Sequence, residues 1–252
     1  MLPLFQYREY IFYSAKSKLF TEVIQNHLGF LWWFLEPILQ MLVYYFVFAI
    51  LINRRTEEFT IFLLIGITSW AWFAKSLIKG GNSIKNSSTT MNQQHFPKAI
   101  LPASEVLVRT IRFMIVFAIL LLFISFLKSP LIQWLHLPAV IFCQFTLITG
   151  ITFLISSILP FIPDLNFMIQ SGLSAMMFIS GVFFEITPDN EYYDIFIINP
   201  MAKILEQYRS IILNGQSPDF FSLILISIIG FTLFVFALYL IKKFEYIYPK
   251  IT

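Results

Sequence analysis

Residues 220–241 read FFSLILISIIGFTLFVFALYLI and contain no charged side chain. A membrane-spanning α-helix needs roughly 20 mostly apolar residues to cross the hydrocarbon core of a bilayer. This stretch is long enough, and polar residues mark its ends, with Asp219 before it and Lys242 and Lys243 after it. It predicts a transmembrane helix, and therefore an integral membrane protein.

The rest of the chain has the same character. Of its 252 residues, 58% are hydrophobic and 12% are charged, whereas soluble domains have roughly 25% charged residues. Five further stretches are long and apolar enough to span: residues 34–52, 59–78, 108–127, 137–159 and 166–184. The sequence therefore predicts an all-α integral membrane fold with six transmembrane helices per protomer, in which residues 1–252 form a single transmembrane domain.

The basic residues predict how these helices are oriented. If the N-terminus is cytoplasmic, the inner segments hold eleven of them: Arg8, Lys16, Lys18, Lys79, Lys85, Lys98, Arg109, Arg112, Lys242, Lys243 and Lys250. The outer segments then hold five: Arg54, Arg55, Lys128, Lys203 and Arg209. Because Lys and Arg are enriched in cytoplasmic loops, both termini are predicted to be cytoplasmic.

The N-terminal cytoplasmic and interface segment, residues 1–33, is amphipathic before the first span. Apolar residues recur there at helical spacing: Phe20, Val23, Ile24, Leu28 and Leu31. This pattern predicts an amphipathic helix that lies along the membrane interface. Trp32 and Trp33 then mark the level where the chain turns inward. Arg8 and Glu9 interrupt the start of the chain, which argues against a cleaved signal peptide.

The outer-face segment, residues 185–219, contains a second amphipathic pattern. Asn199 is a favourable N-cap, Pro200 suits the first helical position, and Gly215 provides a stop. Apolar residues repeat between them: Met201, Ile204, Leu205, Tyr208, Ile211 and Ile212. The pattern predicts a helix of about four turns in the outer interface, too short and too polar to span, after a partly re-entrant stretch. Such a helix either plugs the mouth of the bundle or takes part in gating.

The cytoplasmic loop, residues 80–107, is polar and is interrupted by prolines. The pairs Phe96-Pro97 and Leu101-Pro102 predict extended or turn backbone, because proline disfavours the helical conformation of the residue before it. A loop of this kind suits the docking of a soluble partner, or it is a plain solvated connection.

Polar residues inside the predicted spans are few. Glu36 lies near the start of the first span, and burying it unpaired would be costly, so it is paired, hydrated or functional. Lys75, near the inner end of the second span, can extend its charge to the cytoplasm. Asn166, Gln170 and Ser174 share one face of the fifth span, where they either hold helices together or line a path.

Residues that would carry chemistry form no pattern. His27, His95 and His136 lack metal-ligand spacing, and neither a phosphate-binding loop nor a nucleophile motif occurs. We therefore predict no catalytic, cofactor-binding or metal-binding residue on this chain. A net charge of +3 is also too small and too scattered to predict a nucleic-acid partner.

Three stretches carry a resemblance to a known family. They are LGFLWWFLEP at residues 28–37, HFPKAILP at residues 95–102 and INPMAKILEQYRSIILNG at residues 198–215. With these stretches in this order, the chain resembles the permease subunit of type 2 ABC exporters, in the branch that exports cell-surface polysaccharides such as O-antigen, capsule and teichoic acid. Residues 22–24 read EVI, where that branch often has a basic-aromatic-basic triplet.

The resemblance implies a homodimer in which spans one and five of each copy enclose a channel. The channel-lining residues would be Glu36, Tyr44, Tyr45, Phe48, Phe167, Gln170, Ser174 and Phe178. The outer helix would form a gate with Asn199, Pro200, Tyr208 and Arg209. The substrate would be a lipid-linked polysaccharide that crosses a bacterial inner (plasma) membrane.

The resemblance also implies a motor on other chains. Two copies of a cytoplasmic ABC ATPase would bind ATP and Mg, and this chain would be catalytically silent. The ATPase-coupling residues would be Phe20, Val23, Ile24, Gln93, His95, Phe96 and Pro97. Membrane lipids would surround the rest of the dimer.

Other functions stay open on the sequence alone. An ABC exporter permease for a lipid or a drug would share the same layout. A membrane-embedded transferase would need His, Asp or Glu side chains that converge at one depth. A stand-alone channel or carrier would need a charged selectivity ring, or broken helices in paired halves. Neither of these two patterns is evident in the sequence.

Overall fold

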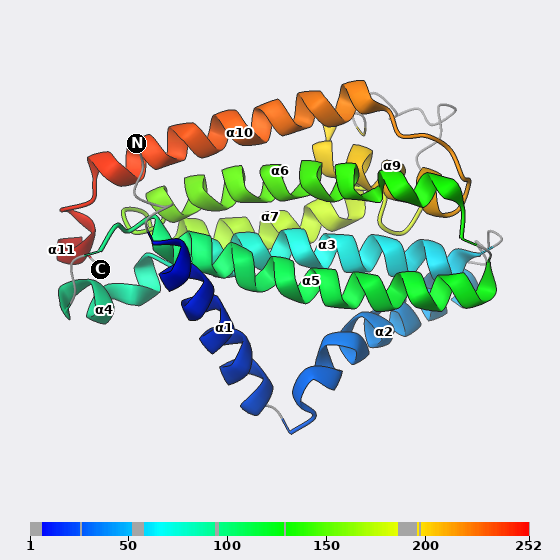
Figure 1. The fold of residues 1–252 in the computed structure, drawn as a ribbon, viewed down its shortest axis with the longest axis horizontal. Coiled ribbons are helices and arrows are strands. Elements are labelled where there is room, and N and C mark those ends of the chain that lie inside the picture. The colour runs from blue at the N-terminus through cyan, green and yellow to red at the C-terminus, as the bar shows by residue number, and fades with distance from the viewer. Residues whose placement is uncertain are drawn as a thin grey trace.

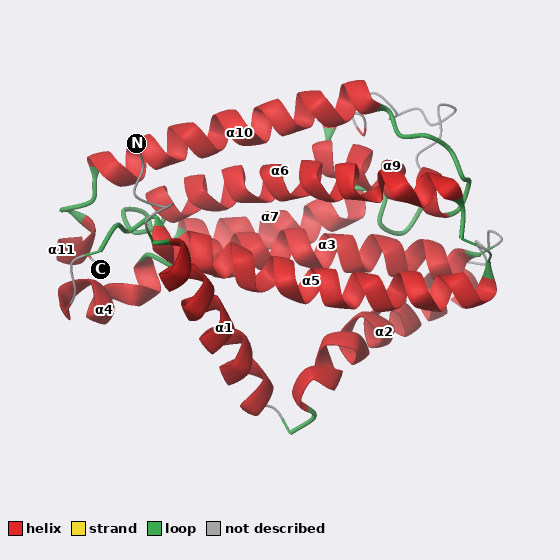
Figure 2. Cartoon of the chain, in the orientation of Figure 1, coloured by secondary structure: helices red, strands yellow, loops and turns green. Residues whose placement is uncertain are grey.

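The computed structural model describes residues 7–25, 27–51, 58–93, 96–128, 130–185, 196 and 198–251, and it describes residues 90, 92 and 93 by their backbone alone. The helices are α1 (Arg8–Ile24), α2 (Trp32–Tyr45), α3 (Phe59–Gly81), α4 (Ser88–Gln93), α5 (Ile100–Leu127), α6 (Leu137–Ile158), α7 (Leu165–Ile179), α9 (Pro200–Ile212), α10 (Phe220–Lys243) and α11 (Tyr248–Ile251). Short 3-10 helices occupy Gly29–Leu31, Lys85–Ser87 and Ile132–His136, and a π-helix occupies Phe46–Leu51. Figure 2 shows helices and loops and no strand within these ranges.

Some predicted features lie outside the described residues. They are His95 of the coupling set, Arg54 and Arg55 of the outer basic residues, the last residue of the predicted first span, and residues 186–195 and 197 of the outer-face segment.

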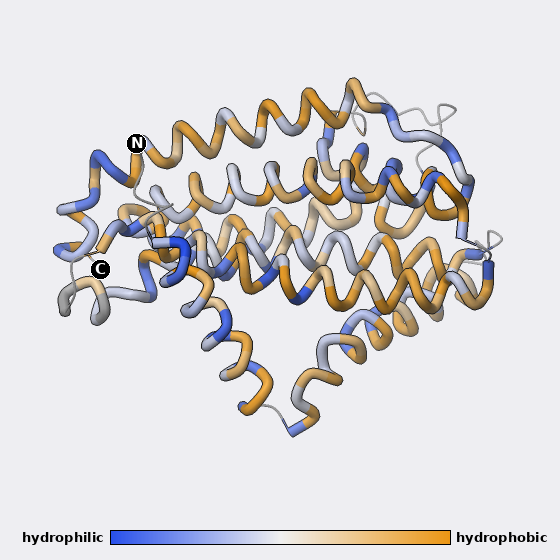
Figure 3. Tube along the Cα trace, in the orientation of Figure 1, coloured by the Kyte–Doolittle hydropathy of each residue, from blue (hydrophilic) through white to orange (hydrophobic). Residues whose placement is uncertain are grey.

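Five helical stretches are long and apolar enough to cross a membrane: Gly29–Leu51, Phe59–Gly81, Ile100–Leu127, Ile132–Ile158 and Phe220–Lys243. Figure 3 shows the apolar colour along most of α6 and α10, with polar positions gathered toward the ends of the bundle. The prediction of an all-α, multi-pass membrane protein is therefore confirmed. The fifth predicted span corresponds to α7, whose 15 residues are fewer than the roughly 20 that a span needs.

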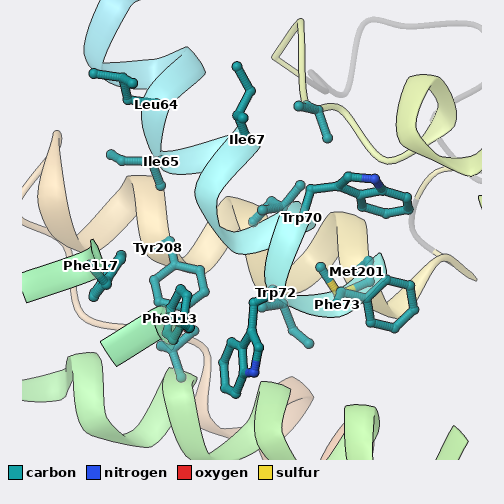
Figure 4. Close-up of a cluster of buried hydrophobic side chains, with 14 of the residues drawn as sticks. Leu64, Ile65, Ile67, Trp70, Trp72, Phe73, Phe113, Phe117, Met201 and Tyr208 are labelled. Carbon is teal, nitrogen blue, oxygen red and sulfur yellow. The ribbon is translucent and has the colours of Figure 1, made fainter. Parts of the chain in front are cut away.

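Helix α3 forms the centre of the bundle (Figure 1). In its most apolar window 78% of the residues are buried, against 11% in the first span. Helices α2, α5, α6, α7 and α9 all contact it. Large rings fill the space where α3, α5 and α9 meet (Figure 4): Trp72 stacks on Phe113 with a centroid distance of 4.1 Å, and Phe117 meets Tyr208 edge-on at 5.4 Å. Helix α3, which is apolar on nearly all sides, is thus covered by neighbouring helices on nearly all sides.

Glycines allow α6 and α10 to pack closely. A Cβ atom at Gly150 would collide with the backbone carbonyl of Gly230, and a Cβ atom at Gly230 would lie 2.7 Å from the backbone nitrogen of Leu147. Small residues at such crossings let the backbones of membrane helices approach each other directly. The two helices accordingly run side by side along the bundle (Figure 1).

The N-terminal helix differs from the prediction. We expected an amphipathic helix over residues 20–31, but α1 ends at Ile24 and the chain then turns at Gly29, whose φ of 53° suits glycine. Helices α1 and α2 meet at this corner and form a V whose corner lies away from the bundle, while α1 contacts α5 and α2 contacts α3 (Figure 1). The apolar spacing beyond Ile24 belongs to the corner, so the predicted position of the helix was wrong.

Helix α5 begins at Ile100, before the predicted start of the span at residue 108. Pro102 therefore lies in the first turn of a helix, where the backbone N–H groups have no helical acceptor and proline is tolerated. The prediction of extended or turn backbone at Leu101 and Pro102 was wrong for this reason. Phe96 and Pro97 do lie in a non-helical segment, as predicted.

The start of α1 lies at the same end of the bundle as α4 and α11 (Figure 1), and we call it the inner end, after the predicted orientation. A small apolar cluster is buried there: Ile84, Met91, Ala99, Phe153, Ala237, Leu238, Ile241 and Tyr248. The hydroxyl of Tyr248 donates to the carbonyl oxygen of Ser157 at 3.1 Å, which fixes α11 against α6. Helix α9 lies at the opposite, outer end.

Candidate functional site

Helix α7 is covered very little by its own protomer. Leu173 is the one fully buried residue of this helix. The predicted channel-lining residues Phe167, Gln170, Ser174 and Phe178 are all exposed, Phe167 by 70% and Phe178 by 52%. The structure therefore gathers these four residues on a helix that presents most of its surface outward.

Asn166, which shares the polar side of α7, has a different role. Its Oδ1 atom accepts a hydrogen bond of 2.7 Å from Nδ2 of Asn82, at the end of α3. Of the two roles that the sequence left open for this polar face, joining helices therefore applies to Asn166. Gln170 and Ser174 stay on the exposed side.

Three predicted channel-lining residues meet on a single ring toward the outer end. The ring centroid of Phe183 lies 4.3 Å from that of Tyr44, 5.2 Å from that of Phe48 and 5.1 Å from that of Phe178. Phe183 is 2% exposed, so its contacts are fully packed. We call these four residues the aromatic cluster. It joins α2 and the π-helix after it to α7, and bulky rings of this kind can close a path between helices.

Sequence reasoning placed Phe183 inside the predicted fifth span and gave it no role. Helix α7 ends at Ile179, and Gly181, with a φ of 69°, turns the chain so that Phe183 faces back toward α2. Gly181 in an otherwise helical pattern was a signal for the turn, but it did not single out Phe183. Tyr45, predicted to line the channel with Tyr44, packs instead near Phe59, at 6.2 Å between ring centroids.

Arg209 on α9 holds the backbone that carries Phe183. Its Nη1 atom donates to the carbonyl oxygen of Gly181 at 2.7 Å, and its Nη2 atom donates to the carbonyl oxygens of Val182 at 2.9 Å and Phe62 at 3.4 Å. The guanidinium also lies over the Phe62 ring, 3.4 Å from its centroid. Burial lowers the pKa of Arg209 to about 9, so the group stays charged at neutral pH.

The first turn of α9 is tied to the end of α7 as well. The Asn199 side chain accepts a hydrogen bond of 3.0 Å from the backbone N–H of Met201, and its Nδ2 atom donates to Oγ of Ser180 at 2.8 Å. Pro200 occupies the first helical position. The cap and the proline are as predicted, and the helix ends at Ile212, shortly before the predicted stop at Gly215.

Helix α9 is largely covered by the rest of the bundle. Most of its residues are buried, and Tyr208, with 0% exposure, packs against Phe117 of α5. Its apolar face therefore packs against α3 and α6, and the position of this helix at the outer interface stays a prediction. The amphipathic pattern cannot tell a lipid surface from a protein surface, because both are apolar. Of the two roles considered for this helix, a plug at the mouth of the bundle and a part in gating, its burial is more consistent with the plug.

The charged residues on α2 and in the middle of α3 and α5 are paired. Glu36 on α2 accepts from Lys75 on α3 at 2.5 Å and from Arg112 on α5 at 2.8 Å. Glu36 is therefore paired, which is one of the three possibilities that the sequence left open. Lys75 contacts Glu36 and does not extend alone to the cytoplasm. Pairing is the usual condition under which charges are tolerated at membrane depth. Glu36 thus lies against α3 and α5, apart from the aromatic cluster.

Two further ion pairs hold α1 against α5. Lys18 Nζ lies 2.7 Å from Oε1 of Glu105, and Glu22 pairs with Arg109. Glu22 is the first residue of the triplet that departs from the family pattern. The Glu22 carboxylate at this position holds α1 against α5. Phe20 is 67% exposed and points away from α5.

The predicted coupling residues fall into two groups. Phe96 lies at the inner end, where its ring is 6.3 Å from that of Tyr10 and 4.7 Å from Nζ of Lys98. Phe20 and Ile24 lie further along α1, roughly 15–20 Å from Tyr10 by helical rise. The remaining described members are Val23 on α1, Gln93 at the end of α4 and Pro97 beside Phe96.

No family model matches the chain. It is similar to an O-antigen export system permease protein RfbA of Myxococcus xanthus, with 26% identity over 220 residues that cover 86% of this chain and 85% of the relative. Two Klebsiella pneumoniae proteins with the same name are 25% identical over 228 residues and 24% identical over 217 residues. They cover 88% and 82% of this chain, and 87% and 83% of the relatives. The predicted resemblance to the permeases of polysaccharide exporters is confirmed.

Proposed function

We propose that this chain is the transmembrane permease subunit of an ATP-driven ABC exporter that moves a lipid-linked polysaccharide of the O-antigen type out of the cytoplasm. The similarity to three O-antigen export permeases, over more than four-fifths of both chains, carries this proposal. The all-helical, multi-pass structure is consistent with it. A permease for a lipid or a drug would share the architecture, but no relative reported above bears such a name.

The proposed channel lies between two copies of this chain. The exposure of Phe167, Gln170 and Ser174 on α7 supports this arrangement, because a polar face turned toward lipid would be unfavourable and a second copy would cover it. The aromatic cluster at the outer end is the proposed seal of the closed channel. Its exposed member, Phe178, would stack on sugars when the channel opens.

In this proposal residues 1–252 form one transmembrane domain with six crossings, and α7 is a short crossing completed by the turn at Gly181. The start of α1 and α11 lie at the same end of the bundle (Figure 1), which an even number of crossings requires. That end faces the cytoplasm, and the membrane is the bacterial inner (plasma) membrane. The helix α9 covers the outer end.

The proposed motor is a pair of ABC ATPase subunits that bind ATP and Mg, while this chain only transmits their motion. Phe96 is the favoured contact, because its ring reaches Tyr10 and so connects the loop to α1. The ion pair between Glu22 and Arg109 continues this connection to α5. Movement of the loop would thereby reach the helices beside the channel.

A strain that lacks this gene tests the proposal. Its surface polysaccharide should be lost, and the lipid-linked polysaccharide should accumulate inside the cell, because synthesis continues without export. The variant Phe96→Ala should restore less surface polysaccharide and retain less ATPase on co-purification than the wild type. Phe126→Ala, which changes a residue 88% exposed near the end of α5, serves as the control. Unchanged surface polysaccharide in the deletion strain would contradict the function, and normal behaviour of Phe96→Ala would contradict the docking site.

A further inference from the structure

Positive charge exceeds negative charge where α1, α2, α3 and α5 meet. Four cations and three carboxylates form two groups of ion pairs there: Lys18 and Arg109 with Glu22 and Glu105, and Lys75 and Arg112 with Glu36. In the second group the single carboxylate of Glu36 pairs with both cations. One cation beside Glu36 therefore lacks an anion of its own. Such an excess charge is costly at membrane depth.

A small cavity lies beside Glu36. Its volume is about 40 Å³, and its walls include Trp33, Trp72, Lys75 and Arg112. Lys75 lies six residues before the end of α3, which is about 9 Å by helical rise. The neighbouring Trp33 is of the residue type that marks the headgroup level. The cavity is therefore within reach of a lipid headgroup in the inner half of the membrane.

Two residues that line the cavity also carry a nitrogen donor without a partner in the described part of the chain. Nε1 of Trp72 and Nε of Arg109 are both buried, and neither has an acceptor among the described residues. Indole and guanidinium nitrogens can donate but cannot accept. The excess positive charge of Lys75 and Arg112 beside Glu36 favours a ligand that carries both negative charge and acceptor oxygens.

We propose that this cavity binds the phosphate group of a lipid headgroup, which takes Arg112 from Glu36 while Lys75 keeps Glu36. Each of the two cations then has an anion of its own. The planar fork of arginine matches phosphate oxygens in a bidentate manner. Glu36, which pairs with Arg112 in the structure, thus competes with the phosphate for this arginine.

The competition between Glu36 and the phosphate for Arg112 can be tested by ligand binding. The full-length chain is purified in an uncharged detergent and mixed with polyprenyl phosphate, phosphatidylglycerol, inorganic phosphate or diacylglycerol, and ligand retention is measured by native mass spectrometry. Glu36→Gln should raise the affinity for a phosphate lipid severalfold, because the competitor is gone. Arg112→Gln should lower it by about tenfold. The matched control is Lys128→Gln, which breaks the ion pair of Lys128 with Glu58 near the outer end and should change nothing.

A gain of binding in Glu36→Gln cannot come from misfolding, so the proposal stays testable even if Arg112→Gln fails to fold. Diacylglycerol retained as well as the phosphate lipids would overturn it, as would equal behaviour of Glu36→Gln and Lys128→Gln. Inorganic phosphate binding as tightly as the lipids would reject a headgroup site. Preference for polyprenyl phosphate identifies a carrier lipid as the source, and equal binding of phosphatidylglycerol identifies the bilayer. Because the assay needs no transport, its failure is distinct from failure of the proposed function.

Discussion

Arg209 donates a hydrogen bond of 2.7 Å to the carbonyl oxygen of Gly181, and this contact ties α9 to the turn that follows α7. The carbonyl groups beyond a helix carry partial negative charge and lack helical donors. A buried guanidinium satisfies them where water has little access. Helix α9 therefore braces the backbone that positions the aromatic cluster.

Replacing Arg209 by lysine should weaken this brace. Lys keeps the charge but loses the planar fork that reaches Gly181 and Val182 together. We expect the free energy of unfolding to fall by roughly 2–3 kcal/mol, because at least one buried carbonyl loses a charged donor. Thermal unfolding of the purified protein in detergent measures this. The control is Arg8→Lys on the exposed start of α1, and equal melting temperatures of the two variants would contradict the role of Arg209.

The variant Phe183→Leu should loosen the aromatic cluster without emptying it. It removes the ring that Tyr44, Phe48 and Phe178 share, and each such ring pair contributes roughly 0.5–1.5 kcal/mol beyond its buried area. We expect vesicles that contain this variant to leak a small neutral sugar faster than vesicles with the wild type. Phe126→Leu, at a position 88% exposed, should leave the leak rate unchanged. If both variants leak alike, the cluster is no seal.

Gly150→Ala should force α6 and α10 apart. The added methyl group would meet the backbone of Gly230, which cannot move away as a flexible side chain would. We expect a loss of roughly 1–3 kcal/mol in the free energy of unfolding, the usual range for overpacking. Gly172→Ala is a matched control, because a Cβ atom there meets nothing within 4 Å. Circular dichroism melts of the two variants compare them directly, and a normal melt for Gly150→Ala would disprove the close crossing.

Exchanging the charges of Glu22 and Arg109 should test how α1 is held. Glu22→Arg places two cations together, and we expect faster hydrogen–deuterium exchange in α1 as it detaches from α5. The double variant Glu22→Arg with Arg109→Glu should slow this exchange again, because the pair is restored in reverse. Glu9→Arg, at an exposed position on the same helix, should behave as the wild type. No recovery in the double variant would mean that the ion pair does not hold α1.

The features predicted correctly from the sequence depend on neighbouring residues. Apolar length identified the helices, and cap chemistry located α9 because Asn199 and Pro200 act within one turn. The position of α1 was missed because apolar spacing continued through a corner that Gly29 creates. The early start of α5 was missed because a proline is excluded from helix interiors but not from the first turn.

The candidate sites depend on residues far apart in the chain, which local patterns do not specify. Glu36 meets Arg112, and Arg209 reaches Phe62 and Gly181, only after the bundle has formed. The sequence indicated that Glu36 needed a partner, because an unpaired charge is costly, but several basic residues could have supplied it. Phe183 could not be singled out among 30 phenylalanines.

The shortness of α7 has a consequence for the membrane around it. Its 15 residues rise about 22 Å, whereas a hydrocarbon core is about 30 Å thick. Hydrophobic mismatch of this kind is relieved by thinning of the bilayer, at a fraction of a kcal/mol for each ångström. Lipids at the rim of the proposed dimer, next to α7, should therefore form a shallow dimple, and a polar polymer that enters the proposed channel there would meet a shorter oily barrier than the average membrane presents.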